Sequence, residues 1–568
     1  MSLLKIALHA HVTQAASVFG VEIPVFSVTD APAHQHGFDV AVDLPLKMAR
    51  LLGRSPFIIA TTIADALREI PLVSRVEAVM PGFVNIAFSD IALASALAEN
   101  ERWIQPFEGT TIIDFGGPNI KPMHVGHLRS LVLGESLRRI LSLSGEVVSD
   151  IHWGDWGLPC GMVLAWLEDN PSSDATVDIG AVYPAAAALA KEDAAFMVRA
   201  REATRLLQAG DPILMAQWDC ISSEAKDVIL KTVVRLGAHF DLLLGEQDAE
   251  ADVPAVVACV MEQGGWREDS GVLLLPVEEP HDTKDVPPVV LRRADGSSLY
   301  AATDLATLLG RERSYAPTRV VYVVDSRQSL HFLQVFRAAR KWGIVSAKTE
   351  LVHRDFGTVN GPGGKPLRTR AGDAMPLQEL IDTVVSHAAI RLKERGRIPE
   401  NELDEAAECI GIAALKVADL SQSAKGGYIL DVEQSLHFEG NTGPALLYAV
   451  VRLRSAISKA HEKGLKTAQT ITSSLFNAPG GAKARALLVE LLAYPDAVQA
   501  ASTELEPCRI TEWAFRTAAA VGRFWEECPI LSEPDMNLVA QRLMLAREVE
   551  GRLSQALYLL GCKVPSAM

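Results

Sequence analysis

Apolar and polar residues alternate with different periods along the chain, and the first hundred positions contain both helical and strand patterns. His36–Gly53 and Ser55–Ile70 have apolar residues at helical spacing, and a serine followed by a proline opens the second segment. Arg75–Ser89 alternates on either side of a Pro-Gly pair, which predicts a β-hairpin. Residues 1–100 are therefore expected to form a small α+β module.

The middle of the chain has the pattern of a parallel sheet with crossover helices. Thr110–Asp114 is short and β-branched, and His127–Gly145 has helical spacing with a glycine suited to a C-cap. Val289–Tyr300 predicts a hairpin about Asp295-Gly296, and Thr318–Ser326 predicts a buried strand. Because right-handed crossovers place the loops after parallel strands on one edge, the loops that follow the first and last of these strands are expected to be neighbours.

Helical patterns fill most of the remaining chain. Residues 170–280 are rich in alanine, glutamate and leucine, and from about residue 376 helical spacing continues almost to the end. A sheet that is interrupted by a helical insertion and followed by helices predicts an α/β nucleotide-binding fold in two halves.

The composition is that of a soluble globular protein. Of the 568 residues, 49% are hydrophobic and 22% are charged, and no apolar run approaches the roughly 20 residues that span a bilayer. The first residues lack the Arg-rich face of a transit peptide, so no membrane association and a cytoplasmic location are expected. The seven cysteines form no C-x-x-C pair, which argues against a disulfide framework and a structural zinc site, and no protein-bound metal is expected.

The net charge of −16 argues only weakly against a nucleic-acid partner, because phosphate binding depends on the local field. Either of two basic groups could bind phosphates or could equally be a solvated surface. One group is Arg452, Arg454, Lys459, Lys463 and Lys466, and the other is Lys365, Arg368 and Arg370.

The most informative segment is Asp114–Arg129, DFGGPNIKPMHVGHLR, which predicts a strand end, a glycine- and proline-rich loop and a helix start. The helix opens on a His-x-Gly-His tetrad, His124–His127. A helix N-terminus offers free N–H groups to phosphates, imidazoles can donate to phosphate oxygens, and a glycine leaves room for a flat base. Taken alone, the tetrad could also be an ordinary helix start with surface histidines.

Two further segments carry polar residues at helix starts. Tyr300 and Asp304 are four residues apart and would share one helix face, where a carboxylate beside an aromatic ring suits a planar cation. An acid that serves the helix dipole is an equal alternative. Gln328 and His331 follow the buried strand and could line the same cleft, or could be ordinary first-turn residues.

A third segment, Asn360–Gly372, is rich in glycine and proline and predicts a mobile loop. It places Lys365, Arg368 and Arg370 where they could close on a leaving pyrophosphate and neutralise charge in the transition state. A solvated basic hairpin is the alternative.

Taken together, these motifs resemble the class I aminoacyl-tRNA synthetases, and specifically the arginyl-tRNA synthetase family. PNIKPMHVGHLRS is similar to the family's extended HIGH motif, and GDWG at Gly154–Gly157 matches another of its signatures. LRRADGSSLYAATDLA and VDSRQSLHFLQ resemble its arginine-pocket segments, and GGKPLRTRAG occupies the KMSKS position. The likeness covers nearly the whole chain.

The resemblance implies a role for each motif residue. The phosphate and adenine contacts of ATP would come from Pro118, His124, Gly126 and His127. Asn119 would hold the amino and carboxylate end of arginine, and the side-chain pocket would consist of Asp114, Tyr300, Asp304 and Gln328. Lys365, Arg368 and Arg370 would replace the mobile lysine loop.

The resemblance also implies an architecture and a reaction. It divides the chain into a tRNA-elbow module at 1–100, a Rossmann-type catalytic domain at 108–375 with a helical insertion at about 170–285, a helical connecting region at 376–437 and an all-α anticodon-binding domain at 438–568. Arginine would be activated by ATP with Mg²⁺ and then transferred to tRNA(Arg). The expected state is a monomer.

The chain departs from the family pattern in three places. In the N-terminal module, HGFDVAVD differs from the family's usual Gly-Asp-aromatic run. The other two departures lie in the catalytic motifs. The PNIKP loop is one residue shorter than the usual PN-x-x-K-P, and the central lysines of KMSKS are missing. Both departures leave open a non-catalytic tRNA-binding paralogue. A small-molecule nucleotidyltransferase can share the tetrad, but the long helical C-terminal region argues against it.

Overall fold

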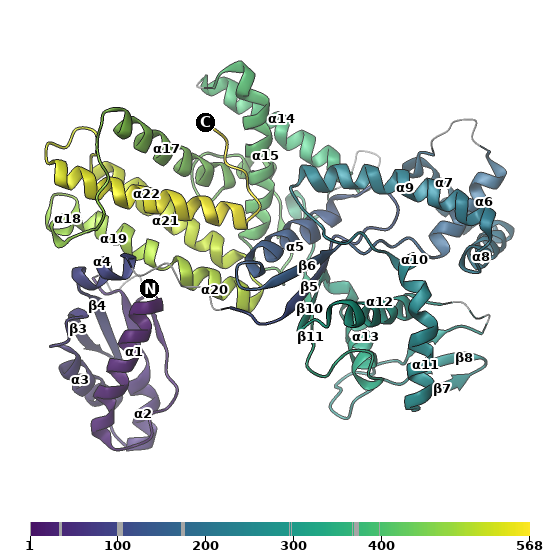
Figure 1. Ribbon diagram of the computed structural model, residues 1–568, viewed down its shortest axis with the longest axis horizontal. Coiled ribbons are helices and arrows are strands. Elements are labelled where there is room, and N and C mark those ends of the chain that lie inside the picture. Colours follow the sequence, from purple (N-terminus) through teal and green to yellow (C-terminus); the bar gives the residue numbers. More distant parts are fainter. Residues whose placement is uncertain are drawn as a thin grey trace.

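The computed structural model describes residues 2–32, 37–98, 106–171, 177–294, 296, 298–365, 367, 374–396 and 398–568. A small N-terminal module lies beneath a helical C-terminal region, a parallel sheet occupies the centre, and a helical insertion extends to the far side (Figure 1). Within the described ranges, no helix combines the length and the apolar character that crossing a membrane requires.

The N-terminal module packs helices against an antiparallel sheet with the strand order β1-β2-β4-β3. Its elements are α1 (Ser2–Ala16), the 3-10 turn Ser17–Phe19, β1 (Val28–Asp30), β2 (Val40–Val42), α2 (Leu44–Leu52), α3 (Pro56–Leu67), β3 (Val73–Val79), β4 (Phe83–Phe88) and α4 (Asp90–Ala98). The predicted hairpin and the helix after Ser55 are confirmed.

The helix predicted over His36–Gly53 is wrong in its first half. Val40–Val42 forms a strand that pairs with β1 on one side and β4 on the other, and all three residues are buried. Residues 33–36 lie outside the described residues. Two β-branched valines that are paired on both sides favour the strand over the helical spacing that follows them.

The central sheet is parallel and has the strand order β11-β10-β5-β6. Its strands are β5 (Thr110–Phe115), β6 (Glu146–Asp150), β10 (Arg319–Asp325) and β11 (Glu350–Phe356), and α5 (Leu128–Leu141), α12 (Tyr300–Tyr315) and α13 (Ser329–Lys341) are the helices beside it. Because β5 and β10 are parallel neighbours, their following loops lie on the same edge, as predicted.

The predicted helical insertion is confirmed, with one addition. It comprises α6 (Leu158–Asp169), α7 (Ile179–Glu192), α8 (Ala194–Gln208), α9 (Pro212–Arg235), α10 (Glu246–Ala249), the 3-10 turn Glu250–Asp252 and α11 (Val253–Gln263). The chain then forms a small antiparallel sheet from β7 (Arg267–Asp269), β8 (Val272–Leu275) and β9 (Val289–Arg292).

Two predicted boundaries are wrong. The hairpin expected over Val289–Tyr300 has only its first strand, because β9 pairs with β8 and the return consists of a single bridge between Arg292 and Ser298. Asp295, the predicted turn residue, lies outside the described residues. Helix α5 ends at Leu141, and Gly145 is required for packing rather than capping, since a Cβ there would lie 2.7 Å from the carbonyl oxygen of Phe107.

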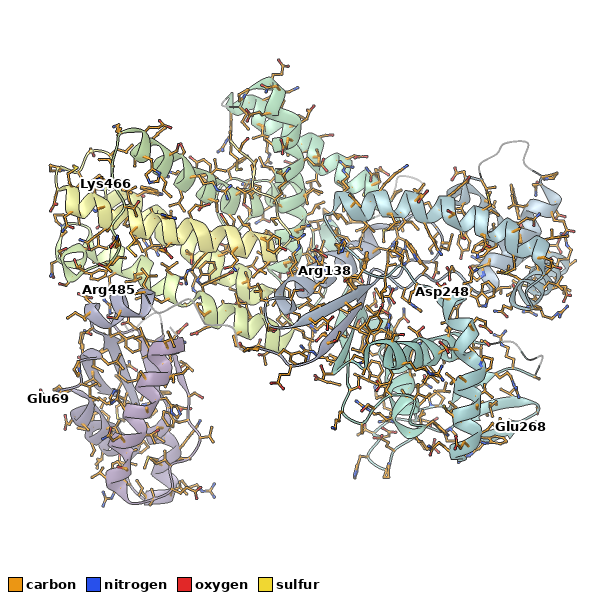
Figure 2. All side chains as sticks on the ribbon, viewed as in Figure 1. Glu69, Arg138, Asp248, Glu268, Lys466 and Arg485 are labelled. Atoms are coloured by element: carbon orange, nitrogen blue, oxygen red, sulfur yellow. The ribbon has the colours of Figure 1, made fainter. Side chains whose placement is uncertain are left out.

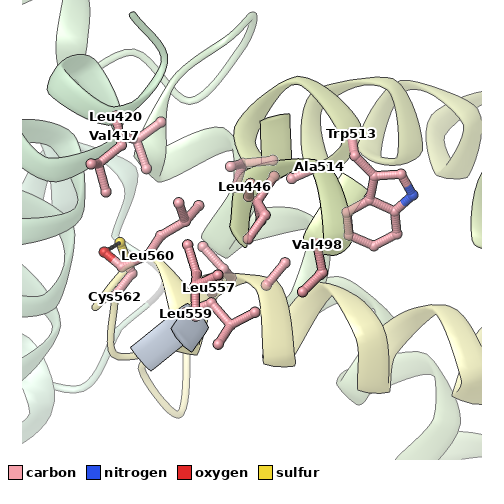
Figure 3. Packing of buried hydrophobic residues seen from close by; sticks show 14 of the residues in the cluster. Val417, Leu420, Leu446, Val498, Trp513, Ala514, Leu557, Leu559, Leu560 and Cys562 are labelled. Carbon is pink, nitrogen blue, oxygen red and sulfur yellow. Dashed lines mark hydrogen bonds between the residues drawn. The ribbon is translucent and has the colours of Figure 1, made fainter. Parts of the chain in front are cut away.

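The C-terminal region is helical, as predicted. After β12 (Val359–Asn360) and the 3-10 turn Pro362–Gly364, it contains α14 (Leu377–Arg395), the 3-10 turn Glu400–Glu402, α15 (Leu403–Leu420), β13 (Tyr428–Ile429), α16 (Val432–Ser435), α17 (Gly443–Glu462), α18 (Ser473–Asn477), α19 (Gly481–Leu492), α20 (Tyr494–Glu504), α21 (Cys508–Glu527) and α22 (Met536–Leu559). Figure 3 shows its core, in which Trp513, Leu446 and Leu557 are almost wholly buried. The Trp513 indole N–H donates to the carbonyl of Glu490 at 2.7 Å.

Salt bridges join the N-terminal module to the C-terminal helices. Arg485 lies between the two parts (Figure 2), and its guanidinium pairs with Asp39 at 2.7 Å and with Asp90 at 3.2 Å. Lys5 of α1 pairs with Asp496 of α20 at 2.8 Å. These contacts hold the module against the far end of the chain.

Helix α5 packs so closely on β5 that only glycine fits at position 134, where a Cβ would lie 2.2 Å from the ring of Phe115. We expect Gly134→Ala to destabilise the protein by about 1–3 kcal/mol and to lower its Tm in a thermal unfolding experiment. Gly551→Ala in α22 is the control, because a Cβ there meets nothing within 4 Å. That variant should be neutral or up to about 1 kcal/mol more stable. Equal Tm values for the two variants would contradict the packing described.

Candidate active site

The tetrad forms a 3-10 turn, Val125–His127, at the start of α5. The Gly126 N–H donates to Nδ1 of His124 at 3.1 Å, and the His124 N–H donates to Nδ1 of His127 at 3.1 Å. The two ring centroids are 4.1 Å apart. Because Nδ1 of His124 accepts in this capping arrangement, its neutral ring carries the proton on Nε2, from where it can donate to a ligand oxygen. Nδ1 of His127 contacts both the N–H and, at 3.2 Å, the carbonyl oxygen of His124, so either neutral tautomer of that ring fits. We call residues 124–127 the HVGH turn.

Both imidazoles of the HVGH turn are neutral near pH 7. Burial is the main reason, and the neighbouring His124 a smaller one, that the pKa of His127 is lowered to about 3. Burial also lowers the pKa of His124, and the positive charges of Lys121 and Arg327 act in the same direction. The turn therefore combines neutral N–H donors with nearby cations, an arrangement suited to phosphate oxygens.

The chain that follows the predicted mobile loop is bonded directly to the HVGH turn. Val125 N–H donates to the carbonyl of Met375 at 3.0 Å, and Leu377 N–H donates to the carbonyl of Met123 at 2.9 Å. Met375 N–H in turn donates to the carbonyl of Leu367 at 3.3 Å. Lys365 is exposed just before this contact, whereas Arg368 and Arg370 lie outside the described residues.

The GDWG segment packs against the loop that contains Pro118 and Asn119. Gly154 N–H donates to the carbonyl of the buried Pro118 at 3.2 Å. A Cβ at Gly154 would lie 2.4 Å from Oδ1 of Asn119, so a side chain there would displace the amide. Asn119 itself is exposed and lies on the loop that precedes the HVGH turn.

Tyr300 and Asp304 lie on the first turns of α12, as predicted from their spacing. The Tyr300 ring is 57% exposed, which leaves its face open to a ligand. Asp304 Oδ2 is 2.6 Å from Nε2 of His331 on α13. Burial lowers the pKa of His331, but the hydrogen bond and charge of Asp304 outweigh burial and raise it overall.

A second carboxyl group lies beside Asp304, and sequence analysis missed it. Burial and the charge of Asp304 raise the pKa of Glu246 to about 8, with smaller contributions from Asp155 and Glu250. Glu246 also contributes to the raised pKa of the Tyr300 hydroxyl, after burial. Among the described residues, no lysine or arginine forms an ion pair with Glu246 or Asp304. We call Glu246, Tyr300, Asp304 and His331 the acidic pocket.

The GDWG segment holds Glu246 in place. Trp156 N–H donates to Oε2 of Glu246 at 3.2 Å, and Glu246 N–H donates to the carbonyl of Trp153 at 3.0 Å. Asp155 is fully buried, pairs with Lys226 at 2.8 Å and accepts from the Gln247 N–H at 3.1 Å. No pattern marks Glu246 in the sequence, because it begins an acidic run, EQDAEAD, within the helical insertion.

Next to the acidic pocket is a cavity of about 370 Å³. Its walls come from the GDWG segment, α8 of the insertion and the start of α12, and its lining includes Trp156, Arg201, Arg293, Tyr300 and Thr303. A ligand in this cavity would contact the exposed ring of Tyr300.

Asp114 does not join the acidic pocket. Its carboxylate lies at the end of β5 and accepts from Nη2 of Arg311 at 2.6 Å, with only 7% of the side chain exposed. Burial raises the pKa of Asp114 more than Arg311 lowers it. Asp150 Oδ2 accepts from the same Nη2 at 2.6 Å. With His152, these acids form a cluster of metal-ligand type, but the guanidinium occupies the position between the two carboxylates.

Gln328 ends the 3-10 turn Ser326–Gln328 between β10 and α13 and is exposed. The Arg327 N–H donates to Oδ1 of Asp325 at 2.8 Å and fixes the turn. Gln328 therefore follows the strand next to β5 on the edge that carries the HVGH turn.

Three family models match consecutive parts of the chain. Residues 3–88 match the arginyl tRNA synthetase N-terminal domain. Residues 92–432 match the catalytic domain of class I tRNA synthetases (R), and residues 446–568 match the DALR anticodon binding domain.

Similar sequences and folds extend over the whole chain. It is 35% identical to the arginine--tRNA ligase of Agathobacter rectalis over 548 residues, which cover 90% of this chain and 91% of the relative. It is 36% identical to that of Maricaulis maris, with 90% and 91% covered. The arginyl-tRNA synthetase of Thermus thermophilus has a similar fold, with a TM-score of 0.81, 23% identity and coverage of 99% of this chain and 100% of that one.

The low pKa of His127 makes stability depend on pH. Below its ordinary pKa of about 6.5 an unfolded His127 binds a proton, but the folded residue does not until about pH 3, so stability falls as the pH drops through this window. We expect the wild type to lose up to about 1.4 kcal/mol per pH unit more than His127→Asn between pH 6 and 4. Denaturant unfolding at several pH values measures this difference. The exposed His281→Asn is the control, and parallel curves for the wild type and His127→Asn would contradict the burial described.

Proposed function

Because the chain belongs to the arginyl-tRNA synthetases of class I, we propose that it joins arginine to tRNA(Arg) through an arginyl-adenylate. The arginine carboxylate attacks the α-phosphorus of ATP and releases pyrophosphate. A ribose hydroxyl at the 3′ end of tRNA then takes the arginyl group. The observation that carries this proposal is the pair of carboxyl groups, Glu246 and Asp304, which form no described ion pair with a lysine or arginine and lie beside the exposed Tyr300.

The acidic pocket suits a guanidinium better than any neutral side chain. Arginine cannot lose its charge, so a ligand guanidinium would always offer a cation to Glu246 and Asp304. Its arrival favours the ionised form of Glu246, whose pKa is raised to about 8 by burial and by Asp304. The Tyr300 ring can stack on the planar cation. A polar pocket of this kind rejects analogues that leave its buried groups unpaired.

The HVGH turn is proposed to bind the ATP phosphates. The Nε2–H groups of His124 and His127 would donate to phosphate oxygens, and Gly126, which is exposed, would lie under the adenine next to Pro118. Neutral donors are suited to this task because they stabilise charge without changing protonation state. No protein nucleophile is needed, so catalysis consists of placing the reactants and stabilising phosphate charge.

The loop between Leu367 and Met375 is proposed to carry the cations that meet the leaving pyrophosphate. Its two ends are bonded to each other and to the HVGH turn, which supports a position beside the phosphates. Lys365, Arg368 and Arg370 would supply the charge. Asn119 would hold the amino-acid end of arginine and Gln328 would belong to the side-chain pocket, and both are exposed on loops at the same sheet edge.

Mg²⁺ is proposed to enter with ATP. Among the described residues, the acids that could hold a metal are Asp114 and Asp150 with His152, and Arg311 lies between the carboxylates. Those residues do not fit a metal ion, so Mg²⁺ would be bound by phosphate oxygens and by residues near them. When bound, it would neutralise phosphate charge.

The domain division proposed for the chain follows its motifs. Residues 108–375 would form the catalytic domain, with an insertion at about 170–285, and residues 376–437 would connect it to the C-terminal domain. Residues 1–100 would contact the elbow of tRNA, and residues 438–568 would contact its anticodon. We propose that the chain acts as a monomer, and the reaction itself supports a cytoplasmic location.

Arginine-dependent exchange between ATP and pyrophosphate, measured with and without tRNA(Arg), tests the proposed function. An active ligase exchanges in the presence of tRNA. A paralogue that binds tRNA without exchange would contradict the proposal, and so would exchange that is independent of arginine.

Replacing a pocket carboxyl should weaken arginine binding selectively. We expect Asp304→Asn and Glu246→Gln each to raise the KM for arginine by about 10- to 100-fold, because a lost hydrogen-bonded charge costs about 1.5–3 kcal/mol, while the KM for ATP changes less than about threefold. Asp252→Asn, on the nearby 3-10 turn Glu250–Asp252, is the control and should leave both values unchanged. Equal changes in the two KM values would contradict the acidic pocket.

Removing an imidazole of the HVGH turn should slow adenylate formation. We expect His127→Ala to lower the kcat of exchange by about 100- to 1000-fold, the usual loss when one preorganised donor is removed. The Kd for arginine should stay within about twofold when measured by calorimetry, and His281→Ala should be as active as the wild type. Exchange at the wild-type rate in His127→Ala would refute the phosphate role.

A further inference from the structure

Arg311 lies on the helix that carries the acidic pocket, yet it contacts none of the pocket residues described above. It follows Asp304 by seven residues and Tyr300 by eleven, so the three side chains project from one side of α12, with Arg311 two turns beyond Asp304. Its side chain is 3% exposed. A buried guanidinium with no part in the proposed chemistry needs another explanation.

One nitrogen of this guanidinium joins two strands. Nη2 donates to Oδ2 of Asp114 and to Oδ2 of Asp150, both at 2.6 Å. Asp114 and Asp150 are the last paired residues of β5 and β6 and lie opposite each other. We call Asp114, Asp150 and Arg311 the ion triad.

A third strand also contacts the triad. Tyr322 of β10 is paired opposite Asp114, and its ring centre lies 5.4 Å from the Arg311 guanidinium carbon. One side chain of α12 therefore contacts the carboxyl ends of three adjacent parallel strands. The loops that leave β5 and β6 lead to Asn119 and to the GDWG segment, which holds Glu246.

The side of α12 that carries Arg311 is not fully packed. A cavity of about 260 Å³ borders the helix there, with Ala306, Gly310, Arg311 and Tyr315 in its lining. Leu305 and Leu308 of α12 pack in the apolar core, and on the side of the cavity the triad adds hydrogen bonds between the helix and the strand ends.

The triad also makes direct binding of a substrate by Asp114 difficult. Asp114 is 7% exposed, and the oxygen it would offer is the one bonded to Arg311. An incoming guanidinium would have to displace the protein's own guanidinium, which would leave a buried charge without a partner.

We propose that Arg311 is a positioning residue for arginine recognition, holding α12 against the strand ends so that Asp304 and Tyr300 meet Glu246, and that Asp114 acts through Arg311 rather than on the substrate. The inference rests on the proposed function, because it concerns the same acidic pocket.

The test compares Arg311→Met, Arg311→Lys and Asp114→Asn. Misplacing α12 should raise the arginine KM and the arginine Kd from calorimetry by about 10- to 100-fold in Arg311→Met, with the ATP KM within about twofold. Arg311→Lys should recover part of this loss, because one nitrogen makes both bonds and an ammonium keeps the charge. Arg313→Met, whose guanidinium is exposed on the same helix, is the matched control and should match the wild type.

Double variants separate the two roles of Asp114. If Asp114 acts through Arg311, Asp114→Asn combined with Arg311→Met weakens arginine binding no more than the stronger single variant. If Asp114 binds the substrate itself, the two effects multiply, and the inference is overturned. It is equally overturned if Arg311→Met lowers the Tm but leaves the arginine Kd within about twofold of the wild type, since the role would then be structural only.

A second variant and a binding measurement cover the cases in which Arg311→Met does not fold or the wild type does not exchange. If Arg311→Met does not fold, Asp150→Asn replaces it, because it removes one of the two bonds and keeps the guanidinium. The calorimetric Kd does not require catalysis, so a wild type that binds arginine without exchange would refute the proposed activity while still testing the triad. A wild type that binds no arginine would overturn both.

Discussion

The rest of the site depends on two carboxyl groups that are kept near each other without a described lysine or arginine partner. Such an arrangement is unfavourable in isolation, because burial and mutual repulsion raise the pKa of Glu246 to about 8. The fold maintains it by bonding Glu246 to the GDWG backbone and Asp304 to His331. A permanently charged planar ligand relieves the repulsion between Glu246 and Asp304. A neutral ligand would not relieve this repulsion, so its binding is less favourable. In the proposed function, selectivity for arginine follows from the protein's own unfavourable electrostatics, and the HVGH turn, proposed to bind phosphates, lies on the same sheet edge.

Two of the acidic sites that the structure describes differ in whether a guanidinium of the protein fills them. In the ion triad, Arg311 satisfies Asp114 and Asp150 at the ends of β5 and β6, and the side chains are almost wholly buried. In the acidic pocket, Asp304 and Glu246 have no described lysine or arginine partner, and the exposed Tyr300 lines a cavity. The difference between the sites is access rather than charge, since both contain two carboxyl groups. Arg311 at the ends of the sheet strands makes this part of the fold rigid, and the acidic pocket stays accessible to a ligand.

Sequence analysis could predict those parts of the site that lie within one strand–turn–helix unit. The HVGH turn, Tyr300 and Asp304 occur where their local patterns place them, because a strand end followed by a helix start is encoded in neighbouring residues. Glu246 could not be found, since its importance arises from contacts with Trp153, Trp156 and Asp304, which are distant in sequence. Asp114 could be located on its strand, but its partner Arg311 is 197 residues away, and no local pattern shows that a carboxylate is already paired. The strand Val40–Val42 was missed for the same reason, because its two neighbouring strands decide its conformation.

Helix α5 connects the HVGH turn to the end of the chain. Its first residue follows His127 directly, and its later turns bond to the last turn of α22, where Ser136 donates to the carbonyl of Leu559 at 2.9 Å and Arg139 donates to the carbonyl of Tyr558 at 2.8 Å. The Arg129 side chain, one turn after the tetrad, donates to the carbonyls of Gly357 and Ser423 at 3.0 and 3.1 Å. A helix that is bonded at both ends moves as a unit, because its internal hydrogen bonds resist stretching. The two imidazoles therefore keep their orientation only while the sheet and the C-terminal helices stay in register, and the large helical region is part of the structure that positions them.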